Sequence, residues 1–281
     1  MEVNIISNCG HDERGKYSGG TAGDHTGEEW KIINWYNRPW NVVLRYPDQL
    51  VGDELAHLGK AAAQNDNVGY DQNQRTTYWT HLQASNYDPA QITVKCEADC
   101  SSGVAANVKA AGYRLGIAAL QKVSKDMYTG NARSALVKAG FQALTESKYL
   151  TSDRYLRPGD ILLYEGHHMA TNLDYGDLAD KPIVEGFKMA QDGVRWWYQY
   201  SDGSYAKSGW KWLTEATGGT SGWYLFDDDG YMLTGYQKDP TGEYFFLCPD
   251  KGIHEGQCMI TDERGKLCIS GEYDFENHKY L

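Results

Sequence analysis

Two residues of the chain, Cys100 and His168, have the types and the settings of a nucleophile and its base. Cys100 lies in residues 99–102, Asp-Cys-Ser-Ser, directly before apolar residues at helical spacing. A thiol at a helix N-terminus meets unpaired backbone amides and the positive end of the helix dipole, which favour the thiolate. A nucleophilic cysteine also needs a base, which can be distant in sequence. His168 follows an apolar run, 161–164, that predicts a buried strand.

Two alternatives to this pair have to be considered, namely His167 as the base and a zinc site. Alternation along a strand directs only one of two adjacent side chains to the inner face, so His167 and His168 do not act together. Zinc binding is the second alternative, because four cysteine and histidine side chains accompany each other here, with a further Cys-Gly-His at 9–11. The four are Cys96, Cys100, His167 and His168. Their spacing fits no closed zinc site, and adjacent histidines seldom reach one ion. We therefore expect no metal and no cofactor.

The elements that must position this pair are helices followed by strands. Apolar spacing predicts helices over residues 48–65 and 73–84, a third from Cys100 to the stop signal at Gly112, and a fourth over 131–144. The turn Arg-Pro-Gly-Asp at 157–160 then leads into the strand before His168. We expect an α+β domain over residues 1–180, in which the helix bearing Cys100 packs on a small antiparallel sheet bearing His168.

The chain changes character between about residues 177 and 187, where helical spacing gives way to short aromatic segments and Asp-Gly turns. The chain holds 21 tyrosines, nine tryptophans and 31 glycines, a surplus of aromatic and turn-forming residues. A repeat of about twenty residues, with two short strands around a turn, must stack on copies of itself to bury its face. Residues 187–281 are thus predicted to form an all-β domain of stacked β-hairpins.

The aromatic rings of this tail allow two interpretations. Each ring can fill the core between repeats, or it can protrude and form a cage for a sugar or a quaternary ammonium group. The array as a whole favours the binding interpretation. The candidate ligand-binding residues are Trp197, Tyr198, Trp210, Trp223, Tyr224 and Tyr236.

Charge and composition exclude several classes of partner. The net charge of −11 and the absence of a basic run argue against nucleic acid. The sequence shows no export signal and no apolar segment of transmembrane length, so a soluble protein without a membrane partner is expected. Without export, the six cysteines are expected to be free thiols.

The motifs around Cys100 and His168 resemble those of the NlpC-type papain-like cysteine hydrolases, and most closely phage endolysins of that type. The resemblance rests on residues 99–102, on Arg-Pro-Gly-Asp-Ile-Leu-Leu at 157–163 and on His-Met-Ala at 168–170, and it spans residues 5–175. Residues 20–29 also resemble the opening of such endolysin domains. The tail segment 222–236 resembles the choline-binding type of cell-wall repeat.

The resemblance implies a papain-like fold, with Cys100 as the nucleophile that attacks an amide carbonyl of the peptidoglycan stem peptide. It implies His168 as the base that later protonates the leaving amine. Asp99 and Ser101 are then expected to contact the peptide end of the substrate, and the Cys100 amide to stabilise the oxyanion. The family usually places a third polar residue on the strand after the histidine strand, but here the chain leaves the domain. Asn172 is the nearest candidate, with Asp24 or His25 as alternatives.

The function implied is that of an endolysin that cuts a stem-peptide amide bond, and we favour an N-acetylmuramoyl-L-alanine amidase. A D-glutamyl endopeptidase of the same fold, a zinc-dependent hydrolase and a non-catalytic wall-binding protein are the alternatives. The expected partners are peptidoglycan and a wall-attached polymer or sugar. Such a protein stays in the host cytoplasm until lysis and then acts at the cell wall.

Overall fold

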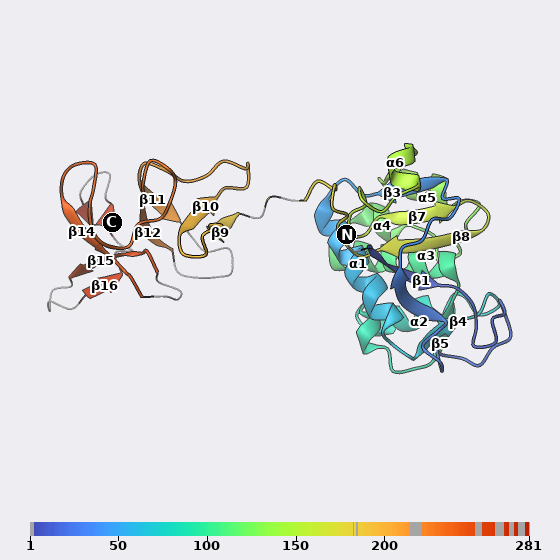
Figure 1. Ribbon diagram of the computed structural model, residues 1–281. Coiled ribbons are helices and arrows are strands. Elements are labelled where there is room, and N and C mark those ends of the chain that lie inside the picture. The colour runs from blue at the N-terminus through green and yellow to red at the C-terminus, as the bar shows by residue number, and fades with distance from the viewer. Residues whose placement is uncertain are drawn as a thin grey trace. The chain divides into compact units, whose positions relative to one another are not determined.

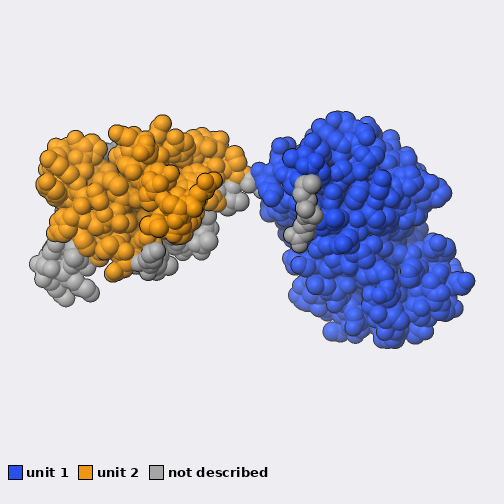
Figure 2. Space-filling model, viewed as in Figure 1, with its two compact units in different colours: residues 1–181 blue, residues 182–281 orange. Residues whose placement is uncertain are grey.

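A computed structural model describes residues 3–181, 183, 185–213, 221–250, 255–261, 267–269, 273–274 and 279–280. The chain divides into two compact units, Met1–Lys181 and Pro182–Leu281, coloured separately in Figure 2. The first unit combines helices with strands, and the described part of the second contains strands (Figure 1). None of the described helices is both long enough and apolar enough to cross a membrane.

The first unit is organised around a six-stranded sheet with the order β2-β1-β8-β7-β3-β6, in which all neighbours are antiparallel. Its strands are β1 (Ile5–Cys9), β2 (Trp30–Asn34), β3 (Val42–Arg45), β6 (Gln142–Leu144), β7 (Ile161–Tyr164) and β8 (His168–Asn172). The predicted strand before His168 is confirmed as β7. The first strand of the chain pairs with β8, one of the last strands of the unit, with Ser7 opposite Thr171.

Helices α1 to α5 cover one face of this sheet. They are α1 (Gln49–Ala63), α2 (Thr77–Ala84), α3 (Cys100–Arg114), α4 (Ala118–Gln121) and α5 (Ala132–Lys138), with a short 3-10 turn η1 at Pro89–Gln91. Helix α6 (Ser147–Leu150) packs on the opposite face. Buried apolar residues of α1, α2 and α3 share one cluster with Leu163 and Met169 of the sheet. A second, smaller cluster contains Ile6, Trp40 and Ala170. The helix bearing Cys100 therefore packs on the strands, as the sequence predicts.

Helix α3 lies close to the sheet because its first turns carry small residues. A Cβ atom added at Gly103 would lie 2.7 Å from the indole of Trp30, which pairs with Cys9 on β1. Overpacking of this kind destabilises a core by about 1–3 kcal/mol. The glycine thus permits the N-terminus of α3 to approach β1.

The helix predicted over residues 131–144 is correct only in its first half. Helix α5 ends at Lys138, and Gly140 adopts a φ of 107° that a helix does not allow. Residues 142–144 form β6 at the edge of the sheet, where they pair with β3. Pairing with a neighbouring strand thus overrides the local helical spacing.

A separate pair of parallel strands leads into α3. These strands are β4 (Val68–Tyr70) and β5 (Cys96–Ala98), with Gly69 opposite Glu97. Residue Asp99 alone separates β5 from α3. The position of Cys100 is therefore set at both ends, by a strand before it and by a buried helix after it.

The second unit consists of β-hairpins. Its strands are β9 (Gly186–Met189), β10 (Trp196–Gln199), β11 (Gly209–Leu213), β12 (Gly222–Phe226), β13 (Gly235–Lys238), β14 (Tyr244–Leu247), β15 (Cys258–Thr261), β16 (Leu267–Ile269), β17 (Tyr273–Asp274) and β18 (Lys279–Tyr280). Strands β9 with β10, β11 with β12 and β17 with β18 form antiparallel pairs, and β13 to β16 form a four-stranded sheet.

Strand β12 connects successive hairpins through its two faces. Tyr224 and Phe226 belong to a cluster that includes Tyr198 of β10. Trp223 and Leu225 face the other way and pack in a cluster with Leu247 of β14 and Cys258 of β15. The hairpins on either side of β12 thus bury apolar residues against it, which is the stacking that the repeat length predicts.

Candidate active site

The position of Cys100 is set by an acidic cap. Asp99 is the N-cap residue of α3, and its carboxylate accepts the backbone N–H groups of Ser101 at 2.9 Å and Ser102 at 2.7 Å. The hydroxyl of Ser102 accepts the N–H of Asp99 in return, at 2.8 Å, which completes a capping box. Loss of a cap of this kind costs about 1 kcal/mol. The cap places Cys100 as the first residue of the helix.

Arg75 holds this cap in place. Its Nε lies 3.0 Å from the Asp99 carboxylate, its Nη2 donates to the hydroxyl of Ser101 at 3.2 Å, and Nη2 also bonds to the carbonyl of Met127. Asp99 and Ser101 are both buried. Both side chains, which were predicted to contact the peptide end of a substrate, are hydrogen-bonded within the helix cap.

The thiol of Cys100 lies against strand β8. The backbone N–H groups of Met169 and Ser101 are directed at it and favour its ionised form, as does the charge of Arg75. Burial outweighs these effects and, together with the negative charge of Asp99, raises the pKa of Cys100 to about 11. The predicted stabilisation of the thiolate by the helix N-terminus is thus too weak to prevail, and the resting thiol is neutral.

The neighbouring strand residue, His168, is held by an asparagine from the opposite end of the unit. Its Nε2 lies 2.8 Å from Oδ1 of Asn8 on β1, and both side chains are buried. Because the amide oxygen only accepts, it selects the tautomer that carries the proton on Nε2. Nδ1 of His168 is then the nitrogen with a lone pair, which a base requires.

The imidazole of His168 is neutral over a wide pH range. Burial and, to a smaller extent, the positive charge of Arg38 together lower the pKa of His168 to about 4. The ring stacks on the indole of Trp40, with centroids 6.2 Å apart. The Cys100 thiol, which lies against Met169, and the imidazole of His168 are therefore both neutral, and the two β8 residues involved are adjacent.

The asparagine that contacts His168 is Asn8, which was not singled out from the sequence. The side chain of Asn172 is engaged elsewhere, because its Nδ2 donates to the carbonyls of Arg157 and Asp174, and its Oδ1 accepts from Asn4. It closes the end of β8 instead. The signal in the sequence was a polar asparagine within the short strand at 5–9.

The two alternative candidates for this role are also engaged elsewhere. The carboxylate of Asp24 accepts five backbone N–H groups from residues 26–30 and so shapes its own loop. The exposed His25 contacts the carbonyl of Ala22 at 3.0 Å and Nζ of Lys95 at 2.9 Å. Neither contact leads to His168.

Two buried carboxyl groups attach residues 23–29 to strands β4 and β5. Glu29 accepts the N–H of Tyr70, and Glu97 accepts the N–H of Gly23. Burial raises the pKa of Glu29 and of Glu97 to about 7 in each case. A Cβ at Gly69 would lie 2.7 Å from the backbone of Gly23, so this glycine permits the close approach.

The candidate zinc ligands are not gathered around one point. Over the described residues, no three His, Cys, Asp or Glu side chains form a group that could hold a metal ion. His167 is exposed and stacks on Tyr164, with ring centroids 4.2 Å apart. Cys9, Cys96, Cys100 and Cys248 are buried free thiols, Cys258 is also buried, and Cys268 lies outside the residues whose side chains are described.

The aromatic residues predicted to bind a ligand in the tail separate into two groups. Tyr198, Trp223 and Tyr224 are buried in the clusters between hairpins, so they have little surface to offer and their binding role is corrected to a core role. Tyr236 is 76% exposed. Trp210 is half-buried, and its Nε1 donates to Asp239 at 3.3 Å.

Trp197 remains, and it lines a hollow of about 400 Å³. The hollow is bounded by the turn of the first hairpin and by residues 229–231, with Tyr205 and Tyr231 as further rings. The guanidinium carbon of Arg195 lies 3.7 Å from the ring centre of Tyr231. Nζ of Lys207 lies 5.5 Å from the ring centre of Tyr205, so both tyrosine rings already have a cation nearby.

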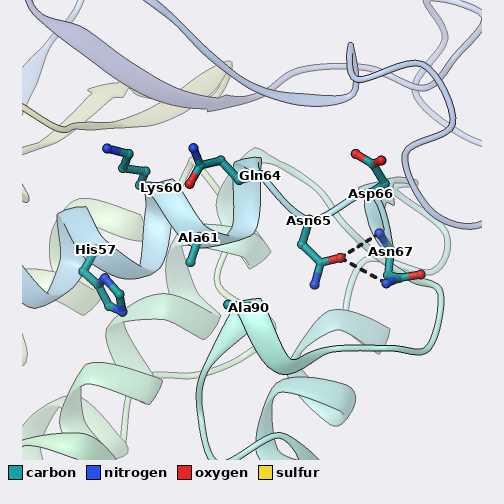
Figure 3. Close-up of a pocket in the computed structure, with 8 residues that line it drawn as sticks. All are labelled: His57, Lys60, Ala61, Gln64, Asn65, Asp66, Asn67 and Ala90. Carbon is teal, nitrogen blue, oxygen red and sulfur yellow. Dashed lines mark hydrogen bonds between the residues drawn. The ribbon is translucent and has the colours of Figure 1, made fainter.

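A further hollow, of about 670 Å³, lies at the C-terminal end of α1 (Figure 3). Its wall contains Lys60, Gln64 and Asp66, and neither Cys100 nor His168 is part of it. Asn65 and Asn67 are hydrogen-bonded to each other at 3.1 Å and to the carbonyl of Ile92. These amides thus fasten the loop after α1.

The comparisons with known proteins point to one family. A family model described as an endolysin-like domain matches residues 6–179. No curated protein matches the chain. Among solved structures, the multimodular pneumococcal cell-wall endolysin from phage Cp-1, complexed with choline, is similar at 17% identity and a TM-score of 0.12. The modular Cpl-1 endolysin complexed with a peptidoglycan analogue is similar at 20% and 0.13. Each match covers 41% of this chain and 42% of the other, less than half of those proteins.

The raised pKa of Cys100 predicts how the thiol reacts with pH. Only the thiolate is alkylated, so the rate with iodoacetamide should rise about tenfold per pH unit from pH 7 towards a plateau near pH 11. The rate is measured by mass spectrometry of the peptide that carries Cys100, with Cys100→Ala as the control for other sites. A fast rate that stays constant from pH 5 to pH 9 would instead reveal a preformed thiolate and imidazolium pair.

Proposed function

The chain belongs to the endolysin-like domain family, which relates it to the endolysins that degrade bacterial cell walls, and we propose that it hydrolyses an amide bond of peptidoglycan with Cys100 as the nucleophile. The observation that carries this proposal is the hydrogen bond of 2.8 Å between His168 and Asn8, one residue along β8 from the amide that faces the thiol. A nucleophile, a base and a group that orients the base are the three parts that such hydrolysis needs.

The proposed fold class of this unit is papain-like. In support of it, the cysteine begins a buried helix that packs on an antiparallel sheet, and the histidine begins a strand of that sheet. The asparagine comes from β1 and precedes the cysteine in the chain. The order of the three residues along the sequence does not matter, because the geometry and the roles define such a site.

In the proposed reaction, Nδ1 of His168 takes the proton of the Cys100 thiol as sulfur attacks the carbonyl carbon of the substrate amide. The backbone N–H of Cys100 donates to the resulting oxyanion, an interaction that is worth about 3 kcal/mol. The imidazolium returns its proton to the leaving amine as the carbon–nitrogen bond breaks. Water, activated by the same imidazole, then hydrolyses the thioester and restores the thiol.

Both reacting groups are neutral at rest, so this proton transfer accompanies the attack. The pKa of Cys100 is about 11 and that of His168 is about 4, which leaves the thiolate and imidazolium pair unfavourable before substrate binds. The amide bond between muramic acid and L-alanine is the proposed site of cleavage. A bond beside D-glutamate requires the same groups, and the mass of the released fragments distinguishes the two.

The first prediction concerns lysis of Gram-positive cell walls, followed as loss of turbidity. Cys100→Ala and His168→Ala should each lower the rate by at least about 100-fold, because they remove the nucleophile and the base. Both variants should still pellet with walls. His167→Ala is the matched control for the histidine, and Cys248→Ala, in the second unit, is the control for the cysteine. Lysis by Cys100→Ala at the wild-type rate would overturn the thiol mechanism.

The second prediction concerns Asn8 as the residue that positions His168. Asn8→Ala should lower kcat by roughly tenfold or more with little change in KM, because the imidazole loses its fixed tautomer. Activity of the wild type should fall as the pH drops through about 4, where His168 gains a proton. Asn8→Asp keeps the acceptor and adds a negative charge, so it should restore activity and move this acid limb to higher pH.

The comparison variant for Asn8 is Asn172→Ala. Its side chain bonds to backbone carbonyls at the end of β8, so its loss should lower the free energy of unfolding and leave kcat per folded molecule unchanged. If Asn172→Ala lowers kcat and Asn8→Ala does not, the roles given to the two asparagines are reversed.

The second unit is proposed to bind a wall-attached sugar or a quaternary ammonium group in the hollow beside Trp197. A ring on the wall of such a hollow attracts either group by stacking or by cation–π interaction. Binding to an insoluble wall raises the local concentration of the bond to be cut and leaves the chemistry unchanged.

The third prediction tests this hollow by co-sedimentation with cell walls. Trp197→Ala should weaken binding about tenfold, the equivalent of about 1.4 kcal/mol. Trp212→Ala is the matched control, because Trp212 is 41% exposed and does not line the hollow. Equal binding by the wild type and Trp197→Ala would remove the hollow from the proposal.

A further inference from the structure

A hollow of about 520 Å³ is lined by Trp40, the residue whose indole stacks on the imidazole of His168. One side of it is formed by residues 37–40 and the other by residues of the segment 145–151. The hollow and the proposed base thus share one aromatic wall.

Arg38 brings an uncompensated positive charge to this hollow. Its guanidinium donates to the hydroxyl of Tyr36 at 3.1 Å and lies 5.8 Å from the ring centre of Tyr164. In the described part of the chain, no carboxylate forms an ion pair with it. Since a guanidinium has five N–H donors, most of its donors are left for a ligand.

The acidic residues closest to the walls of the hollow have other partners. Glu146 pairs with Lys148 at 3.0 Å, and Asp153 accepts the backbone N–H of Asn4 at 2.8 Å. Glu165, which follows Tyr164 in the chain, pairs with Arg133 at 2.9 Å. Among the described residues, Arg38 is therefore left open to an anionic ligand.

We infer that this hollow binds a free carboxylate of the stem peptide, paired with Arg38 and placed against the indole of Trp40. The inference rests on the proposed hydrolysis, since it names the part of the substrate that lies next to His168. A carboxylate matches the planar fork of a guanidinium with two parallel hydrogen bonds. The hydroxyls of Thr145 and Ser147 supply further donors on the facing wall, whereas the hydroxyl of Thr151 already donates to the carbonyl of Ser147.

Binding of a carboxylate at Arg38 also changes the strength of the base. The groups placed around His168 are Asn8 from β1, Tyr164 from β7 and the pair Trp40 and Arg38, and the Cys100 thiol lies against the next residue of β8, Met169. Of these, Arg38 alone is charged at neutral pH, and its charge opposes formation of the imidazolium. A carboxylate that neutralises it makes His168 a better base only while substrate is bound.

The test uses two soluble muramoyl tripeptides that differ at one group. The second residue is D-glutamate, with a free carboxylate, or D-isoglutamine, with an amide in its place. Both are titrated calorimetrically into full-length Cys100→Ala, which binds without cleavage. The D-glutamate form should bind about tenfold more tightly, as expected for a charge-assisted pair.

Substitutions at Arg38 locate this preference. In the Cys100→Ala background, Arg38→Gln should abolish it and Arg38→Lys should retain part of it, because lysine keeps the charge and loses the fork. Arg154→Gln removes an equal charge from the surface pair with Asp177 and should leave the preference intact. Thermal unfolding of each variant confirms that it is folded.

The imidazole of His168, observed by NMR in the same background, gives a second measure. Its pKa should rise from about 4 when the D-glutamate form binds, and the D-isoglutamine form should leave it unchanged. Equal affinity for the two peptides, or a preference that survives Arg38→Gln, overturns the inference. Because no step requires catalysis, a wild type that fails to lyse walls overturns the hydrolysis alone and leaves the carboxylate site standing.

Discussion

The cap of α3 by Asp99 is the interaction on which the site depends. One carboxylate binds two amides of the first turn and pairs with Arg75, which in turn holds the carbonyl of Met127. These contacts hold Asp99 and so fix the position of Cys100, the next residue. The negative charge of Asp99 also raises the pKa of Cys100, so the cap defines the position of the thiol and makes its ionised form less stable.

Because burial and the charge of Asp99 raise the pKa of Cys100, the proposed mechanism depends more on a base for the thiol proton than on the helix dipole. The dipole acts on a group within the first turn and is worth at most about 2 kcal/mol. Burial of a thiol that has an aspartate as its neighbour opposes ionisation more strongly, and the pKa of Cys100 accordingly rises. In the proposed mechanism, His168 therefore receives a proton from a thiol rather than stabilising a thiolate that already exists.

Much of the local structure could be predicted from the sequence, and the long-range pairing could not. Helical spacing after residue 99 and the apolar run before His168 were sufficient to predict α3 and β7. Asn8 could not be found in this way, because its role depends on β1 pairing with β8 across 160 positions of sequence. Asn172 was chosen because it is near His168 in the chain, but its amide serves the backbone of its own strand. The burial that neutralises Cys100 likewise depends on contacts from distant segments.

In the tail, too, the sequence predicts the repeats but not which aromatic rings are buried. Its repeats were evident from the spacing of aromatic residues and turns, but the spacing did not distinguish the core rings from the open ones. Strand β12 accounts for this difficulty, because its successive residues enter two different clusters and both faces are buried. A strand of this kind belongs to two cores at once. A stack built in this way can gain or lose a hairpin wherever one cluster ends, so the reach of the tail can change in evolution in steps of one repeat while the first unit keeps its sequence.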